Sequence, residues 1–443
     1  MRSQLAPGGF RKIIEKGTIF YNCLNRASTF TATGVATLAT GAWPAQHGIV
    51  ADRWREGAIV VPASEEEMLA TTLVAEAAVD TNTRVTVIGL DRTPAAIFAG
   101  TPDVRLYWMS DQGTFATNFD APDWVAAFNS LKKAETVRNT NWLALGARPD
   151  APPLRTLNYS PDRPAEFMAL YRSSPFAQTA QFEFACELIE RERMGQSGTM
   201  DVVCLLAGSM ELLGYETGAR SPLMQQMTLH LDRELERLFT QLAKMPGEGA
   251  YNLALAGAHG VPPEPAAESR SRMAVRGEDL AVAIQKALAS TATGRVEKYV
   301  YPFLYLSTDG VRDPEPFRLA AARAAMQHPA VAGYFTAGGA GSVHNEWELR
   351  FRNSFHPVRS GDVMLSYRPE YVESLEQDRG VSYGSLYNYD ALVPMGFYGP
   401  QFRVGEHEQT VEAVDLAPTL ARVLGVAAPS SSTGRPLAEA LAE

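Results

Sequence analysis

Cysteine and histidine are scarce in this chain of 443 residues, which contains 3 cysteines and 7 histidines. The cysteines, Cys23, Cys186 and Cys204, form no Cys-x-x-Cys pair. This spacing excludes a disulfide framework and a cysteine-rich zinc site. We therefore expect the three cysteines to be buried thiols that pack as small apolar side chains.

The chain also lacks a long hydrophobic run and an excess of basic residues. No stretch reaches the roughly 18 apolar residues of a membrane helix, so the sequence predicts no membrane span. Lys and Arg total 40 and Asp and Glu total 50, which gives a formal charge of −10. Without a basic stretch, binding to a nucleic-acid backbone is not expected. The hydrophobic share of 46% and the charged share of 20% are typical of a folded globular protein.

Short apolar runs alternate with longer amphipathic stretches. Residues 84–90, 200–206 and 251–257 are apolar throughout, which is typical of buried parallel strands. Residues 173–195 and 221–245 have helical periodicity and begin at serines. This order predicts an α/β fold in which a mainly parallel sheet is flanked by helices. Ligands of such a sheet bind at the carboxyl ends of its strands.

Two stretches interrupt the alternation, one rich in aromatic residues and proline and one opening with a polar loop. We interpret them as insertions that form a lid over the carboxyl edge of the sheet. The predicted organisation is one domain over residues 1–443, with a core of about 1–95, 173–262 and 346–443 and insertions of about 96–172 and 263–345.

The stretch 28–54, STFTATGVATLATGAWPAQHGIVADRW, is the most informative. Its hydroxyl side chains come directly before a helix-like run of small residues. Backbone N–H groups and the helix dipole favour an anion at such a helix start. Thr31 is therefore either a nucleophile towards a phosphoryl group or the N-cap of the helix, and spacing alone favours the cap. His47 is expected to hold a turn rather than a metal.

Ten segments along nearly the whole chain resemble the alkaline phosphatase superfamily, in particular its type I phosphodiesterase/nucleotide pyrophosphatase branch and the phosphomonoesterases close to it. They are GGFRKIIEKGTIF, STFTATGVATLATGAWPAQHGIV, RLYWMSDQGTF, PDWVAAFN, SSPFAQTAQFEFACELIERERMG, AGSMELLGYETG, LAGAHGV, RSGDVMLSYRPEY, GSLYNYDALVPMGFYG and VDLAPTLARVLGV. The resemblance implies a three-layer α/β fold with a two-zinc phosphoesterase centre and a Thr or Ser nucleophile between the metals. Such a centre needs two cations roughly 4 Å apart.

The resemblance also assigns positions to the metal ligands, and most of them carry other residues here. The Asp of the family's first strand has no counterpart. In SMELLGY, Glu211 stands at an Asp position and Tyr215 at a His position. In GAHGV, Ala258 stands at an Asp position and His259 is retained. Leu392 stands at the last His position. Ala and Leu cannot bind zinc and Tyr is a poor ligand, so full two-zinc occupancy is not expected.

The positions that contact substrate are mixed. Asp52 stands where close relatives carry Asn, and its charge would repel phosphate. Leu90 and Arg92 stand where relatives carry Lys-x-Arg. Arg92 could grip a phosphate with two hydrogen bonds, although an ion pair with Asp91 or Asp52 is slightly favoured. Without a metal or a base, the hydroxyl of Thr31 is a weak nucleophile.

Three further histidines, His344, His356 and His407, could rebuild a metal site. No two of them have the i, i+4 spacing of a helical metal motif, so exposed loops are the favoured interpretation.

Two functions are consistent with these residues. The favoured one is a catalytically impaired member of the superfamily, or a pseudoenzyme, that binds a phosphate-ester-like small molecule. The alternative is an active phosphoric ester hydrolase in which Thr31 is the nucleophile and a rebuilt or single-metal site forms around Glu211 and His259. Because fold does not determine function, the site must decide between them.

The start of the chain also differs from the family. Residues 1–10 lack the apolar core of a signal peptide and lead into helix-like sequence with no strand before it. A missing central strand would leave unpaired backbone groups and uncovered apolar surface. We expect Met1 to be an internal methionine of a longer natural protein, whose upstream segment carries the strand and possibly an export signal. That protein would be periplasmic or secreted.

Overall fold

A computed structural model describes residues 2–80, 82–264, 273–289, 294–307, 311–342, 346–369, 371–374 and 382–442. Within these ranges, no helix is both long enough and apolar enough to span a membrane.

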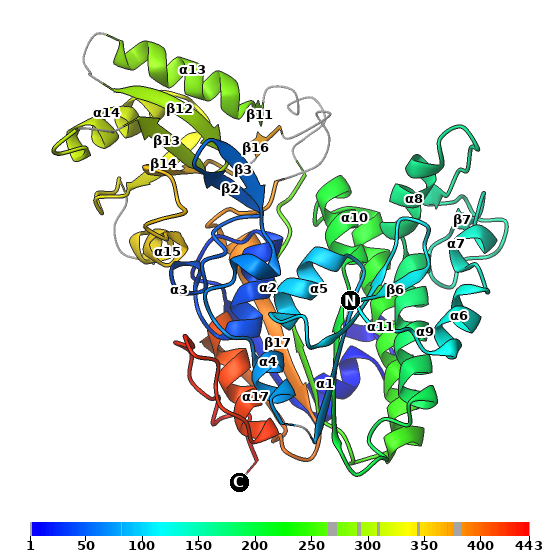
Figure 1. Ribbon diagram of the computed structural model, residues 1–443. Helices are drawn as coiled ribbons and strands as arrows, with labels where there is room; N and C mark the ends of the chain where they lie inside the picture. The colour runs from blue at the N-terminus through cyan, green and yellow to red at the C-terminus, as the bar shows by residue number, and fades with distance from the viewer. Residues whose placement is uncertain are drawn as a thin grey trace.

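Two four-stranded sheets form the lower part of the molecule as drawn in Figure 1. The first has the order β10-β17-β1-β18 and consists of β1 (Thr18–Leu24), β10 (Leu253–Ala256), β17 (Leu392–Tyr398) and β18 (Gly405–Glu412). In it, β1 runs parallel to β18, whereas β17 runs antiparallel to both β1 and β10. The second has the order β6-β5-β4-β9 and consists of β4 (Thr83–Gly89), β5 (Arg105–Met109), β6 (Phe115–Thr117) and β9 (Met200–Leu206). In this sheet β4 is parallel to β5 and to β9.

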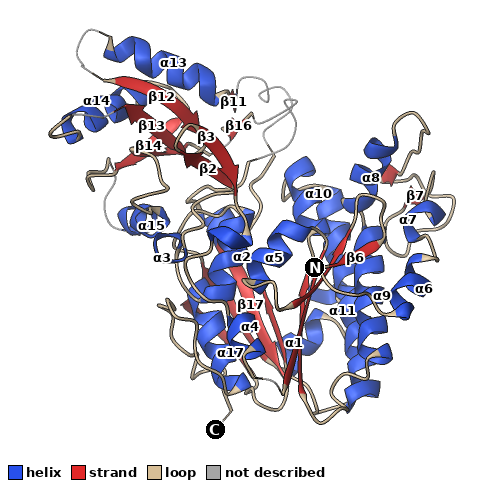
Figure 2. Cartoon of the chain, viewed as in Figure 1, coloured by secondary structure: helices blue, strands red, loops and turns tan. Residues whose placement is uncertain are grey.

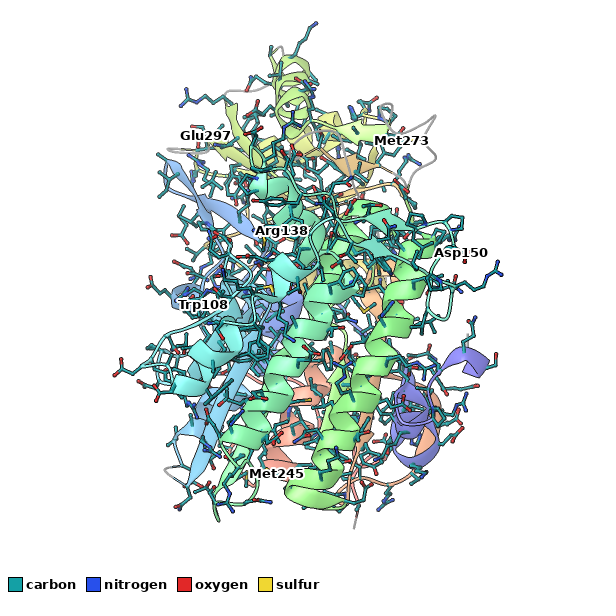
Figure 3. The ribbon with its side chains drawn as sticks, turned by 90° about the vertical axis from the view of Figure 1, so that its right-hand side faces the viewer. Trp108, Arg138, Asp150, Met245, Met273 and Glu297 are labelled. Carbon is teal, nitrogen blue, oxygen red and sulfur yellow. The ribbon has the colours of Figure 1, made fainter. Side chains whose placement is uncertain are left out.

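Helices lie on both sides of these sheets, which gives the three-layer α/β arrangement seen in Figures 1 and 2. The long helices α9 (Pro175–Arg191) and α11 (Pro222–Leu242) pack against each other on one side, as Figure 3 shows. The other side carries α2 (Thr31–Thr40), α4 (Leu73–Ala78), α5 (Arg92–Ala99) and α17 (Leu416–Leu424). Two shorter helices are α1 (Phe10–Lys16) and α10 (Ser209–Thr217).

A third sheet lies apart from the other two, at the upper left of Figure 1. Its order is β12-β13-β15-β14, formed by β12 (Arg295–Val300), β13 (Phe303–Ser307), β14 (Val331–Thr336) and β15 (Val363–Tyr367). Helices α13 (Gly277–Leu288), α14 (Glu315–Ala325) and α15 (Glu346–Ser354) accompany it, and the hairpin of β2 (Arg53–Glu56) and β3 (Ile59–Pro62) lies nearby.

The remaining elements are short. They are α3 (Pro44–His47), α6 (Asp123–Asn129), α7 (Lys133–Thr136), α8 (Pro164–Arg172), α16 (Asn388–Ala391), β7 (Asn141–Trp142), β8 (Arg155–Thr156), β11 (Ala274–Val275) and β16 (Val372–Glu373).

The α/β fold class and its main elements are confirmed. The strands predicted at 84–90, 200–206 and 251–257 correspond to β4, β9 and β10. Strands β4 and β9 are parallel as predicted, whereas the expectation that β10 is a parallel strand is wrong, because it pairs with β17 in antiparallel orientation. The helix predicted from residue 221 begins there because the hydroxyl of Ser221 accepts a hydrogen bond from the N–H of Met224.

The proposed boundaries of core and insertions differ from the sheets at two places. Strand β5 pairs with β4, so part of the stretch 96–172 belongs to the same sheet as the core. Strand β15 pairs with β13 and β14, so part of the stretch 346–443 belongs to the third sheet. The division into one domain with two insertions stays a proposal.

Each of the two lower sheets ends in a strand whose outer edge is not paired with another described strand. Strands β9 and β10 are the end strands of their sheets, and neither has a strand partner on its outer edge within the described ranges. Most residues of β9, and all of β10, are half-buried, although both runs are apolar. The expectation that these two strands are fully buried is therefore wrong, because a strand is covered on all sides only when both of its edges are paired.

Candidate functional site

Thr31 is the first residue of α2 and is half-buried. The N-cap residue of α2 is Phe30, so the interpretation of Thr31 as the cap is wrong. Thr33 takes up the local backbone acceptors instead, since its hydroxyl donates to the carbonyl oxygens of Ser28 and Phe30. The hydroxyl of Thr31 instead contacts Glu211 and His259, which follow β9 and β10.

The first group at Thr31 is Glu211, which lies in the first turn of α10 just after β9. The Thr31 hydroxyl donates to Oε1 of Glu211 at 2.5 Å. The pKa of Glu211 is raised to about 8, mainly by burial; the hydrogen bond from the Thr31 hydroxyl lowers it, and the charges of Asp52 and Asp91 contribute to the rise. A large fraction of Glu211 is therefore protonated at neutral pH.

The second group is His259, which follows β10. Its Nε2 lies 3.2 Å from Oγ1 of Thr31, and its Nδ1 lies 2.7 Å from the carbonyl oxygen of Gly260. Because a carbonyl oxygen only accepts, Nδ1 carries the hydrogen and Nε2 of the neutral ring is an acceptor. Burial lowers the pKa of His259, which favours this neutral form. The ring of Tyr383 packs on the imidazole with 4.4 Å between ring centroids.

The end of β10 is held close to α2 by a glycine. A Cβ atom on Gly34 would lie 2.4 Å from the carbonyl oxygen of Ala258, which real Cβ atoms do not approach so closely. Only glycine lets the first turn of α2 come near enough to β10 for His259 to reach Thr31. The proximity of the two side chains thus depends on a close backbone approach.

Asp52 lies at the same helix start. Its Oδ1 accepts a hydrogen bond of 2.9 Å from the backbone N–H of Ala32. Its surface remains accessible to water, yet the surrounding protein displaces enough solvent to raise the pKa of the carboxyl group. The carboxylate therefore accepts the hydrogen bond of a backbone N–H group at which an anionic ligand would otherwise bind.

The contacts of Arg92 are with residues outside this group, Glu65 and Trp108. It is half exposed, its guanidinium lies 2.8 Å from a carboxylate oxygen of Glu65, and it lies over the ring of Trp108. The ion pair expected with Asp91 or Asp52 is therefore wrong. Asp91 instead pairs with Arg172, which also donates to the carbonyl oxygen of Leu90.

The three residues at the substituted ligand positions are placed as follows. Tyr215 lies in α10, one turn after Glu211, with its ring 6.1 Å from that of Tyr383. Ala258 precedes His259, and Leu392 begins β17 with 36% of its surface exposed.

Sequence reasoning missed two residues of this region, Tyr383 and Asp390. The hydroxyl of Tyr383 donates to the backbone carbonyl oxygen of Glu211 at 2.5 Å. Because its ring also packs on His259, Tyr383 contacts both residues that flank the Thr31 hydroxyl. Asp390 is fully buried and accepts from the hydroxyl of Ser385 at 2.5 Å, and burial raises its pKa to about 8. Both residues belong to the segment GSLYNYDALVP or immediately precede it, so the resemblance of that segment was the available signal.

The other histidines do not approach Thr31 in the contacts of the described residues. His47 is buried and holds a turn, as predicted, since its Nδ1 accepts from the N–H of Ile49. His407 stacks on Phe20, and Nδ1 of His356 accepts from the N–H of Val358. His344 lies outside the described residues.

The remaining groups that could bind a metal ion are other acidic or histidine clusters and the three cysteine thiols. Over the ranges that the structure describes, no three His, Cys, Asp or Glu side chains come together in a way that could hold a metal ion. All three cysteines are free, Cys23 is buried, and burial raises the pKa of each thiol. Cys186 and Cys204 are half-buried.

Known proteins resemble this chain along nearly its whole length. It is 25% identical over 492 residues to the alkaline phosphatase PhoV of Synechococcus elongatus, covering 98% of this chain and 88% of PhoV. It is 24% identical over 503 residues to the alkaline phosphatase PafA of Elizabethkingia meningoseptica, covering 99% of this chain and 91% of PafA.

Solved structures share the fold. The crystal structure of wild-type PafA matches with a TM-score of 0.86 at 21% identity, covering 100% of this chain and 95% of that one. Murine ectonucleotide pyrophosphatase/phosphodiesterase 5 matches with a TM-score of 0.58 at 14% identity, covering 96% and 91%. The sequence model described as type I phosphodiesterase/nucleotide pyrophosphatase matches residues 3–372. Since that match spans well over half of the chain, the protein belongs to the type I phosphodiesterase/nucleotide pyrophosphatase family, within the alkaline phosphatase superfamily.

Proposed function

We propose that this protein is a catalytically impaired member of its family, a binding pseudoenzyme that does not hydrolyse phosphate esters with two metal ions. One observation carries the proposal. The two side chains that could serve as ligands, Glu211 and His259, both contact the hydroxyl of Thr31, and no third ligand side chain joins them among the described residues.

The residues present do not fit a two-zinc centre. A catalytic zinc takes three protein ligands drawn from thiolate, imidazole and carboxylate, so two ions would need about six. The site supplies one imidazole nitrogen and one carboxyl group whose raised pKa keeps much of it protonated. Tyr215, Ala258 and Leu392 add no carboxylate or imidazole. No step of a reaction is therefore assigned to a metal here.

The ligand of such a protein would be a phosphate-ester-like small molecule, bound weakly. Murine ectonucleotide pyrophosphatase/phosphodiesterase 5 has been solved in an inactive form with AMP, which makes this class the natural one to test. The negative charge of Asp52, which lies at the start of α2, works against a doubly charged phosphate at Thr31. Arg92 and Arg172 are each paired with a carboxylate, that of Glu65 and that of Asp91.

A second candidate function is phosphoester hydrolysis with Thr31 as nucleophile and a rebuilt or single-metal site. It is favoured by the names of the curated relatives, both alkaline phosphatases, and by the presence of Thr31 at the start of α2. It requires a metal ligand that the described residues do not bring to the site.

Metal content measured together with activity separates the two candidates. The purified chain is dialysed against zinc and then against buffer, and bound metal is counted by mass spectrometry. The same sample is assayed with an aryl phosphate monoester and an aryl phosphate diester. We expect less than one zinc per chain and no turnover above the Thr31→Ala variant. Near two zinc ions per chain with Thr31-dependent turnover would establish the second candidate instead.

A restoration variant tests whether the ligand positions are correctly identified. The triple variant Tyr215→His, Ala258→Asp, Leu392→His is expected to take up more zinc than the unsubstituted chain. A matched triple with the same replacements at dispersed surface positions, Tyr21→His, Ala151→Asp and Leu69→His, controls for non-specific binding. Equal uptake by the two triples would contradict the assignment.

A further inference from the structure

We propose that Thr31 and His259 form a metal-independent nucleophile and base that hydrolyse neutral carboxylic esters. This activity goes beyond the proposed function, which concerns the loss of metal-dependent phosphoester hydrolysis. It uses the same hydroxyl with a different activating group and a different class of substrate.

The orientation of His259 supports a role as base. Its Nδ1 donates to the carbonyl oxygen of Gly260 at 2.7 Å, and this bond directs the lone pair of Nε2 towards Oγ1 of Thr31, 3.2 Å away. The ring is held from its face by Tyr383, whose own hydroxyl is anchored on the backbone of Glu211. A nucleophile, a base in hydrogen-bond reach and a third group that orients the base are the parts that activate a hydroxyl.

Glu211 competes with His259 for the only hydrogen of the Thr31 hydroxyl. The hydrogen points to Oε1 of Glu211, at 2.5 Å, in the described arrangement. When it turns to Nε2 of His259, Oγ1 presents a lone pair to a substrate and its proton to the base. A residue at position 211 that donates a hydrogen bond rather than accepting one would favour the second arrangement.

Charge selects the class of substrate. The carboxyl groups of Asp52 and Glu211 border the hydroxyl, and the nearby guanidinium of Arg172 is paired with Asp91. A phosphate dianion would be repelled by the carboxylate of Asp52, whereas an ester without charge would not. Ala258, which lies against the first turn of α2, is apolar and half-buried and carries no charge that would disfavour an alkyl or aryl group.

The reaction balances without a cofactor. Oγ1 of Thr31 bonds to the acyl carbon while its proton passes to Nε2 of His259. The bond from the acyl carbon to the leaving oxygen then breaks, and the imidazolium returns the proton to the departing alcohol. Water attacks the acyl-threonine in the same way, releases the carboxylic acid and restores Thr31. The N–H of Ala32 already donates to Asp52 and that of Gly34 to the carbonyl oxygen of Phe30, so neither of these two groups is assigned to the developing oxyanion.

The test uses the full chain stripped of metal with EDTA, with 4-nitrophenyl butyrate as substrate. We expect hydrolysis that is unaffected by EDTA, is lost in Thr31→Ala and is retained in Thr31→Ser. His259→Ala is expected to lower kcat about a hundredfold, the usual contribution of a general base, with little change in KM. Mass spectrometry after a rapid acid quench should find a butyryl group on the peptide that contains Thr31.

Glu211→Gln gives a readout that a purely structural role would not move. The amide can donate to Oγ1, which turns the hydroxyl towards His259, and we expect kcat to rise about fivefold, the equivalent of one neutral hydrogen bond. Thr136→Ala and His407→Ala serve as matched controls at positions away from the site and should leave the rate unchanged. Thermal melts of all variants exclude loss of folding.

The possible outcomes are distinct. Hydrolysis that does not depend on Thr31, or no hydrolysis above the uncatalysed rate, overturns the inference but leaves the proposed loss of zinc chemistry standing. Hydrolysis abolished by EDTA and restored by zinc overturns both. Phosphate monoester turnover with bound zinc and no ester turnover overturns both as well, and supports the alternative function.

Discussion

The backbone N–H of Ala32 donates to Oδ1 of Asp52 at 2.9 Å, so the start of α2 already holds a negative charge supplied by the chain itself. In a phosphate-binding protein this N–H group would be available to the ligand. The contact therefore implies that Asp52 lowers the affinity of the site for anionic ligands.

Asp52→Asn tests that link. Asparagine can accept the same hydrogen bond at a helix start, so the free energy of unfolding should change little. Loss of the charge should raise the affinity for inorganic phosphate about tenfold at neutral pH. Isothermal titration calorimetry measures the affinity, and Asp150→Asn on an exposed turn is the matched control. Identical phosphate affinity in the variant and the natural chain would show that Asp52 does not govern anion binding.

Asp390→Asn tests the cost of a buried carboxyl group. Burial raises the pKa of Asp390 from 3.8 to about 8, so the unfolded chain releases this proton at a lower pH than the folded chain. Between about pH 4 and pH 8 the folded state binds more protons, and Asp390 therefore makes stability fall as pH rises. At pH 5, about one unit above the pKa of the unfolded group, only a small part of this loss has occurred, so in urea titrations we expect the midpoint of the variant to exceed that of the natural chain only slightly.

Near pH 8 the Asp390→Asn variant is expected to unfold at a higher urea concentration than the natural chain, because asparagine does not ionise. Asp150→Asn, measured at both pH values, controls for the loss of a surface charge. A difference between Asp390→Asn and the natural chain that is the same at pH 5 and pH 8 would contradict the raised pKa.

Gly34→Ala separates helix propensity from close packing. Alanine is about 1 kcal/mol more favourable than glycine inside a helix, so propensity alone predicts a more stable protein. The new Cβ atom would meet the carbonyl oxygen of Ala258 at 2.4 Å, and overpacking of this kind costs about 1–3 kcal/mol. We expect net destabilisation in urea unfolding. An increase in stability would show that β10 can move away from α2 at little cost.

The unpaired edges of β9 and β10 predict uneven hydrogen exchange within the lower sheets. Amides of residues 200–206 and 253–256 should exchange faster than those of β4 and β1, which are paired on both sides. Strand edges without a partner open with a lower free energy than strands inside a sheet. Hydrogen–deuterium exchange followed by mass spectrometry resolves these peptides. Equal protection of β9 and β4 would mean that the edge of β9 is covered.

Much of the architecture could be predicted from the sequence because it depends on local pattern. Apolar runs at 84–90 and 200–206 identify β4 and β9, and the serine at 221 marks the start of α11. Family resemblance also indicated which strand ends matter, and the structure brings Thr31, Glu211 and His259 together there. The strand runs and the helix start depend on neighbours in sequence, whereas the meeting of the three side chains was expected from the family resemblance alone.

Other features depended on contacts between distant residues. Arg92 was expected to pair with Asp91 or Asp52, yet it pairs with Glu65, and Asp91 pairs with Arg172. Spacing cannot rank such partners, because several carboxylates lie within reach of a long side chain once the chain is folded. The N-cap of α2 was misassigned by one residue for a similar reason, since the hydroxyl of Thr31 bonds to Glu211, 180 residues away, rather than to the start of its own helix.

By itself, the sequence determined the α/β class, the order of the main elements and the chemical types available at the carboxyl edge, because these follow from residue identity and short-range periodicity. Only the tertiary structure decided that the Thr31 hydroxyl lies between Glu211 and His259 and that a carboxylate occupies the N–H of Ala32. It also decided that β9 and β10 end their sheets with an unpaired edge. Hydrogen bonds require distances within a few tenths of an ångström, and these are set by packing among segments far apart in the chain.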